Sequence, residues 1–215
     1  MDDREKLIRL SKYEARDAIL FRDDAPVPME FHSTFGPLIA KTCVPSHLID
    51  HVNDHVSAQL PTDVGSELLL SEEFCRSGGD DSLQLWLMGQ LRRYVKQVER
   101  NDQAGIEIDQ CWVVNQYADT ASPMHFHSGD LSGVMYLTVP EIAPGQEQKN
   151  YISGRKAGYI NFLIGGKQRF SRSLVSFQPV VADFFVFPAW LLHGAEPFQG
   201  TGVRRSLAFN ARVID

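Results

Sequence analysis

Two histidines that lie one residue apart, His125 and His127, stand in the stretch PMHFHSGDLSGVMYL at residues 123–137. Side chains two positions apart on a strand face the same side, so both imidazoles can reach one point. Imidazole binds iron, zinc, copper or nickel, and it can be neutral near pH 7. Two surface histidines at a loop edge would have the same spacing. A metal site therefore needs a third ligand.

His193 is the candidate third ligand, because it follows an apolar strand in the segment FPAWLLHGAEP at residues 187–197. Another group of histidines, His47, His51 and His55, recurs every four residues and so shares one stripe of a predicted helix. No carboxylate-rich motif surrounds that stripe, and we expect its histidines to be solvated.

The elements that must position these side chains are short strands. From about residue 106, apolar residues alternate with polar ones between Gly, Pro and Asn, which is typical of strands. The predicted strands are 106–119, 131–139, 158–165, 173–180, 182–190 and 204–213. Upstream, Pro45 and Ser46 offer the start of an amphipathic helix, and a second one is predicted within residues 80–100.

The order of elements predicts an α+β, mainly β protein, in which helices within residues 44–100 support a β-sandwich or barrel of residues 106–215. Residues 1–30 are charge-rich and are expected to form an arm or short helix outside the core. The next stretch, to Val44, resembles an edge strand that leads into the first helix. With no repeat or low-complexity linker, residues 1–215 are expected to form a single domain.

The last strand separates its side chains into two sets. One face carries polar and small residues, Arg204, Ser206, Ala208, Asn210 and Arg212. The other is mostly apolar and carries Arg205, Leu207, Phe209, Ala211 and Val213. A polar, partly wet interior is what a small barrel with a ligand site needs. The apolar face is expected to pack outward, against the second sheet or the helices.

The features of residues 112–210 resemble, in their order, the iron(II) and 2-oxoglutarate-dependent oxygenase superfamily. These features are His-x-His, a Ser-Gly-Val-x-Tyr-Leu strand, a Phe-Pro-x-x-x-x-His turn and an Arg-x-Ser strand. More narrowly, the run from the two histidines to Leu137 looks like one group of 2-oxoglutarate oxygenases. The resemblance implies a double-stranded β-helix, or jelly roll. It also implies a dioxygenase, a hydroxylase that uses Fe(II), O₂ and 2-oxoglutarate.

Several residues of this chain stand at positions that have known roles in the superfamily. The resemblance makes His125 and His193 metal ligands and makes Arg204 the residue that binds the far carboxylate of 2-oxoglutarate. A guanidinium suits that role, because its fork matches a carboxylate and stays charged when buried. Tyr136 matches a position that supports the same carboxylate, and Ser132 and Ser206 match positions that line its pocket. The neighbouring Arg205 is expected to face outward.

One position departs from the wider superfamily, which has a carboxylate where this chain has His127. Either His127 is a ligand and completes a three-histidine face, or Asp130 swings in and supplies the carboxylate. His127 is favoured, because its spacing from His125 requires no loop rearrangement. Three neutral ligands would leave the site one charge more positive than a face of two histidines and one carboxylate. Asn115 and Gln116 are expected to serve structure, such as capping the turn at 118–124.

The composition constrains partners and location. A net charge of −6 argues against a general affinity for nucleic acid or acidic membranes. Three separated cysteines, a charged N-terminus and no long apolar run favour a cytoplasmic protein with free thiols. No recognisable motif identifies the substrate, which is expected to be a small molecule or a peptidyl group. The polar segment 145–159 is a candidate cover of the cavity entrance. Two further functions fit the motifs: a cupin-type three-histidine dioxygenase without 2-oxoglutarate, and a non-catalytic metal-binding jelly roll.

Overall fold

The computed structural model describes residues 18–21, 29–33, 36–60, 66–100, 103–145, 156–166 and 173–214. An eight-stranded antiparallel sheet has the order β1-β2-β3-β11-β7-β14-β5-β4. In that order its strands are Ala18–Phe21, Met29–Ser33, Leu38–Cys43, Asp183–Pro188, Leu131–Thr138, Arg204–Ile214, Gly105–Gln116 and Ser66–Leu69. Most of the candidate segment 145–159 lies outside the described residues, so its role as a cover stays a prediction.

A second, four-stranded sheet has the order β10-β9-β12-β6. Its strands are Leu174–Phe177, Ile160–Leu163, Leu192–Ala195 and Ser122–His125. Two short strands, β8 (Glu141–Ile142) and β13 (Gly200–Thr201), form a separate pair. Two facing antiparallel sheets of this kind make a jelly roll, and the predicted fold class is confirmed.

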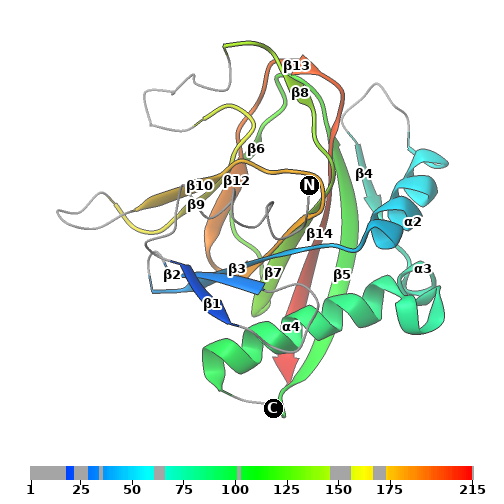
Figure 1. The fold of residues 1–215 in the computed structure, drawn as a ribbon, viewed down its shortest axis with the longest axis vertical. Coiled ribbons are helices and arrows are strands. Elements are labelled where there is room, and N and C mark those ends of the chain that lie inside the picture. Colours follow the sequence, from blue (N-terminus) through cyan, green and yellow to red (C-terminus); the bar gives the residue numbers. More distant parts are fainter. Residues whose placement is uncertain are drawn as a thin grey trace.

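The helices are α2 (Ser46–Ser57), α3 (Glu72–Arg76), the 3₁₀ turn η1 (Gly79–Asp81) and α4 (Leu83–Glu99). They gather beside β4, β5 and β14, away from the four-stranded sheet (Figure 1). Pro45 precedes the first residue of α2 as expected, and the Ser82 hydroxyl caps α4 by accepting from the Leu85 amide. None of the helices in the described part of the chain is long and apolar enough to cross a membrane.

The large sheet has a core on each face. Phe184 and Val186 pack with Leu207, Phe209 and the apolar stripes of α2 and α4, whereas Phe185 and Phe187 pack between the two sheets. This alternation follows from the pleat of β11, which sends successive side chains to opposite faces. The apolar face of β14 packs against the helices, which is one of the two partners expected for it. The three cysteines are free thiols, also as expected.

The N-terminal prediction is wrong where the structure describes it. β1 and β2 are strands that extend the large sheet, and they form neither an arm nor a short helix. Met29, at the start of β2, is buried. β3 is likewise an interior strand, because it pairs with both β2 and β11. Their neighbours in the sheet supply the hydrogen bonds that make these short segments strands.

Candidate metal centre and its cavity

Three histidines meet at one end of the four-stranded sheet. His125 on β6 and His193 on β12 are cross-strand partners, and His127 follows β6 in a turn. The potential ligand atoms of the three imidazoles all lie within 4.8 Å of one another. The residues that sequence spacing selected as metal ligands are therefore brought together, although they lie up to 68 positions apart along the chain.

Backbone carbonyls orient two of the rings. The Nδ1 atom of His125 lies 2.6 Å from the Pro123 carbonyl oxygen, and Nδ1 of His193 lies 2.8 Å from that of Leu191. Because a carbonyl can only accept, each Nδ1 carries the hydrogen and donates it. The lone pair of each ring is then on Nε2. Fixing the tautomer in this way is how a second layer of contacts prepares histidines for a metal.

Electrostatics favour the neutral form of His127 and His193. Burial, as the largest cause, lowers the pKa of His193 to about 4 together with the neighbouring His125 and His127, against the opposing effect of the Leu191 carbonyl. Burial, followed by the proximity of His125, also lowers the pKa of His127. Neutral imidazole is the form that binds metals.

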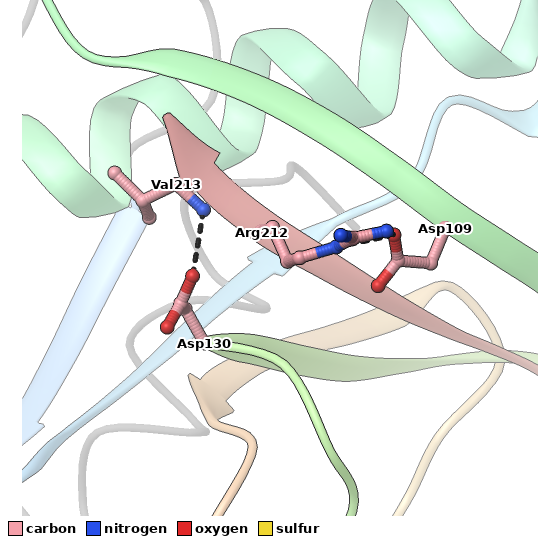
Figure 2. Close-up of polar contacts among 4 residues, drawn as sticks. All are labelled: Asp109, Asp130, Arg212 and Val213. Carbon is pink, nitrogen blue, oxygen red and sulfur yellow. Dashed lines mark hydrogen bonds and ion pairs between the residues drawn. The ribbon is translucent and has the colours of Figure 1, made fainter. Parts of the chain in front are cut away.

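Asp130, the alternative third ligand, is bound elsewhere. Its Oδ2 accepts a hydrogen bond of 2.9 Å from the backbone amide of Val213 on β14. Figure 2 shows this carboxylate pointing at Val213, while Arg212 turns toward Asp109. The group of candidate metal ligands found among the described residues contains the three histidines and not Asp130. The geometry thus favours His127 over Asp130.

The histidines open into a cavity of about 650 Å³. Its wall includes Trp112, Val114, Tyr136, Phe187 and Arg204. The cavity-facing side of β14 is confirmed in part, since Ser206 and Ala208 line the cavity with Arg204, whereas Asn210 and Arg212 of the predicted face do not. Ser132 contributes to the wall too, but its hydroxyl donates to the Phe209 carbonyl oxygen at 3.1 Å.

Arg204 is buried in this wall, with 1% of its surface exposed. Its Nε donates to Gln116 Oε1 at 3.0 Å, and its Nη1 donates to the Glu196 carbonyl oxygen at 2.9 Å. The second terminal nitrogen, Nη2, is buried and has no hydrogen-bond partner in the part of the chain that the structure describes. A buried guanidinium nitrogen that lacks an acceptor is costly, so this atom indicates a place for an anion.

The charge of Arg204 is not neutralised by these acceptors, which are an amide and a backbone carbonyl. Burial lowers the pKa of Arg204, while Tyr136 and Glu196 act in the opposite direction, and arginine stays protonated in proteins. The side-chain carboxylate of Glu196 accepts instead from Asn161 Nδ2 at 2.7 Å. Burial raises the pKa of Tyr136 well above its usual range, so its phenol remains a neutral donor.

Two roles differ from the sequence predictions. Gln116 and Asn115 do not cap the following turn with their side-chain oxygens; these accept from Arg204 and Arg205, respectively. Arg205 does face away from the cavity, but it is buried against α2, where Nη1 donates to Asn53 Oδ1 and Ser57 Oγ at 3.0 Å each. Both contacts follow from the pairing of two predicted strands, β5 and β14, because their register places Gln116 opposite Arg204.

Comparison with known proteins agrees with this geometry. Residues 110–210, which contain the three histidines and Arg204, match the family described as "Putative 2OG-Fe(II) oxygenase". The resemblance to iron(II) and 2-oxoglutarate-dependent oxygenases is thereby confirmed for this segment. No curated protein sequence matches the chain.

Solved structures share the fold at low identity. A Pseudomonas putida prolyl-4-hydroxylase is 14% identical, with 81% of this chain and 92% of that chain covered and a TM-score of 0.53. The viral collagen prolyl hydroxylase of Paramecium bursaria Chlorella virus-1, solved as a 2-oxoglutarate complex, is 11% identical (82% and 96% covered, TM-score 0.54). HygX of Streptomyces hygroscopicus, solved with nickel and 2-oxoglutarate, is 12% identical (84% and 83% covered, TM-score 0.54).

Proposed function

We propose that this protein is an Fe(II)- and 2-oxoglutarate-dependent dioxygenase that hydroxylates its substrate. One observation carries the proposal: three imidazoles line the same cavity as a buried guanidinium nitrogen that has no hydrogen-bond partner among the described residues. The first group suits a divalent transition metal and the second suits a carboxylate. Iron(II) with 2-oxoglutarate requires both.

The donor set fits iron(II). His125, His127 and His193 would hold the metal through one face, with the rings of His125 and His193 aimed by their bonds to backbone carbonyls. Bound iron would supply the redox chemistry, in which O₂ oxidises 2-oxoglutarate to succinate and CO₂ and one oxygen atom enters a C–H bond of the substrate. The protein contributes binding, orientation and the exclusion of water.

The wall of the cavity fits 2-oxoglutarate. Arg204 would bind the far carboxylate through Nη2, while Gln116 and the Glu196 carbonyl hold the rest of the guanidinium in place. Tyr136, a neutral phenol, would donate to the same carboxylate. Ser132 and Ser206 would line this pocket. The presence of 2-oxoglutarate in the structures of two proteins of this fold supports the assignment.

The remaining cavity would take the substrate, a small molecule or a peptidyl group. Trp112 stands beside the proposed metal, with its ring edge-on to that of His127 at a centroid distance of 5.6 Å. Apolar walls such as Trp112 and Val114 exclude water from the reacting atoms, which strengthens electrostatic interactions inside the site.

The proposal is tested by turnover of 2-oxoglutarate. Protein reconstituted anaerobically with Fe(II) is mixed with 2-oxoglutarate and then exposed to O₂, and succinate and CO₂ are quantified. We expect equal amounts of both, formed only when Fe(II), 2-oxoglutarate and O₂ are all present, and no product from a His193→Ala variant.

The three-histidine donor set also suits a cupin-type dioxygenase that needs no 2-oxoglutarate, in which Arg204 would bind an acid group of the substrate. O₂ consumption that does not depend on 2-oxoglutarate would favour that enzyme. Iron binding with neither succinate formation nor O₂ consumption would favour a non-catalytic metal-binding module.

A further inference from the structure

We infer that Asp130 is a positioning residue for His127, because it fixes the turn that carries the third proposed metal ligand. The inference rests on the proposed metal site, since it assigns a role to a carboxylate that is not itself a ligand. It concerns residues 127–130, which belong to the connection between β6 and β7.

Both ends of this turn are bound to one buried residue. The amide of His127 donates to the Ala189 carbonyl oxygen at 2.9 Å, and the Ala189 amide donates to the Asp130 carbonyl oxygen at 2.9 Å. Ala189 has no exposed surface. His127 and Asp130 therefore hold fixed positions relative to the same point, and a displacement of Asp130 is transmitted to His127.

The Asp130 end is anchored to β14 by a second pair of bonds. The ladder between β7 and β14 ends with Leu131 opposite Ala211. Asp130 continues it, because its amide donates to the Ala211 carbonyl oxygen at 3.0 Å and its Oδ2 accepts from the Val213 amide at 2.9 Å. Figure 2 shows the carboxylate below the end of β14, directed at Val213. The side chain thus takes the place of one more backbone acceptor.

The ion pair of the neighbouring Arg212 is with Asp109 and not with this carboxylate. Arg212 is the nearby cation, but its Nε donates to Asp109 Oδ1 at 2.8 Å, and Figure 2 shows it turned away from Asp130. Asp130 therefore acts through the geometry of an accepted hydrogen bond. The side chain of asparagine has the same length, and its amide oxygen can accept that bond, whereas the methyl group of alanine cannot.

This difference separates a positioning residue from a ligand. If Asp130 holds the turn, Asp130→Asn retains the bond to Val213 and keeps His127 in place, while Asp130→Ala loses it. If Asp130 instead supplies a carboxylate to the metal, removal of its charge in Asp130→Asn is as damaging as Asp130→Ala.

The test is Ni(II) binding by the full chain, measured by calorimetry in the wild type and variants. We expect Asp130→Ala to weaken Ni(II) affinity about 10-fold, the lower end of what loss of an outer-shell partner costs. Asp130→Asn should stay within about twofold of the wild type, as should Asp109→Ala, which removes the adjacent carboxylate, a hydrogen-bond partner of Arg212. In a His127→Ala background, Asp130→Ala should cause no further loss, because its effect passes through His127.

Several outcomes overturn the inference. It fails if Asp130→Asn binds Ni(II) as weakly as Asp130→Ala, or if Asp130→Ala binds Ni(II) as tightly as the wild type. It also fails if Asp130→Ala lowers the Ni(II) affinity equally in the His127→Ala background. A wild-type protein that binds no Ni(II) removes the metal site and the inference together. If the variants show the expected pattern of Ni(II) affinities but the wild type turns over no 2-oxoglutarate, the inference stands and only the proposed function is contradicted.

Discussion

His125 and His193 are direct cross-strand partners on β6 and β12, with their ring centroids 4.5 Å apart. The ladder between two strands therefore sets the separation of the two imidazoles. His127 depends on a turn instead, and it completes the group at centroid distances of 4.8 and 5.2 Å from the other two rings. Two proposed ligands are thus fixed by a sheet and the third by a loop.

Metal binding should depend on the strand pair. We expect His125→Ala or His193→Ala to weaken Fe(II) or Ni(II) affinity by more than about 100-fold, since loss of an outer-shell partner alone costs 10–100-fold. His51→Ala is the matched control, because His51 lies on α2, outside the cavity, and its ring stacks on Phe74 of α3. Calorimetric titration of each purified variant measures the effect. Equal losses in all three variants would contradict the assignment of the site.

The adjacent arginines should separate ligand binding from stability. Arg204→Met should weaken binding of 2-oxoglutarate to the Ni(II)-loaded protein by about 10- to 100-fold, the value of a charge-assisted bond of roughly 1.5–3 kcal/mol. Arg205→Met should leave that affinity unchanged, because Arg205 lies on the opposite face of β14, where it joins Asn115 to α2. It should instead lower the free energy of unfolding by about 1–3 kcal/mol.

Titration with 2-oxoglutarate and urea unfolding measure these two effects. Similar losses of affinity in both variants would rule out the specific role of Arg204.

Gly133 should not tolerate a side chain. A Cβ at this position of β7 would lie 2.4 Å from the Phe185 carbonyl oxygen and 2.4 Å from the Phe209 ring. Because Phe209 is buried among α4 and β11, it cannot move away without opening the core. We expect Gly133→Ala to lower the free energy of unfolding by at least the roughly 1–3 kcal/mol of overpacking. Gly166→Ala is the control, since open space surrounds that Cβ. Thermal unfolding compares the two, and equal midpoints would contradict this packing.

The stability of the protein should depend on the ionisation of Asp183. Burial raises the pKa of this fully buried carboxyl from 3.8, and the charge of Lys41, 3.0 Å away, lowers it only in part. The folded state therefore binds the proton more tightly than the unfolded state, and each tenfold difference in proton affinity corresponds to about 1.4 kcal/mol. The contribution of this group to stability is full below pH 3.8 and is lost as the pH rises through the folded pKa.

An Asp183→Asn variant lacks this titration. The free energy of unfolding of the wild type, relative to the variant, should consequently fall as the pH rises from below 3.8 toward neutrality. Urea unfolding at a series of pH values gives the difference directly. A difference that grows with pH would show that Lys41 outweighs burial.

The sequence predicted much of the fold where a pattern is local. Six strands of the C-terminal half and both long helices follow from alternation and helical spacing, because burial of one face imposes a period on the residues themselves. The strands β1, β4 and β6 carry no such pattern. Each is four residues long and is a strand because a neighbour in a sheet supplies its hydrogen bonds.

By itself, the sequence determined which side chains could do chemistry. Residue type and spacing selected His125, His127 and His193, and the resemblance to the oxygenase superfamily added Arg204, because imidazole and guanidinium have few chemical equivalents. Only the tertiary structure decided which of these side chains share a cavity and what holds them there. Gln116 reaches Arg204 across 88 positions, and Asp130 reaches Val213 across 83. Hydrogen bonds between such distant residues depend on strand pairing and on the course of loops, which no local pattern encodes.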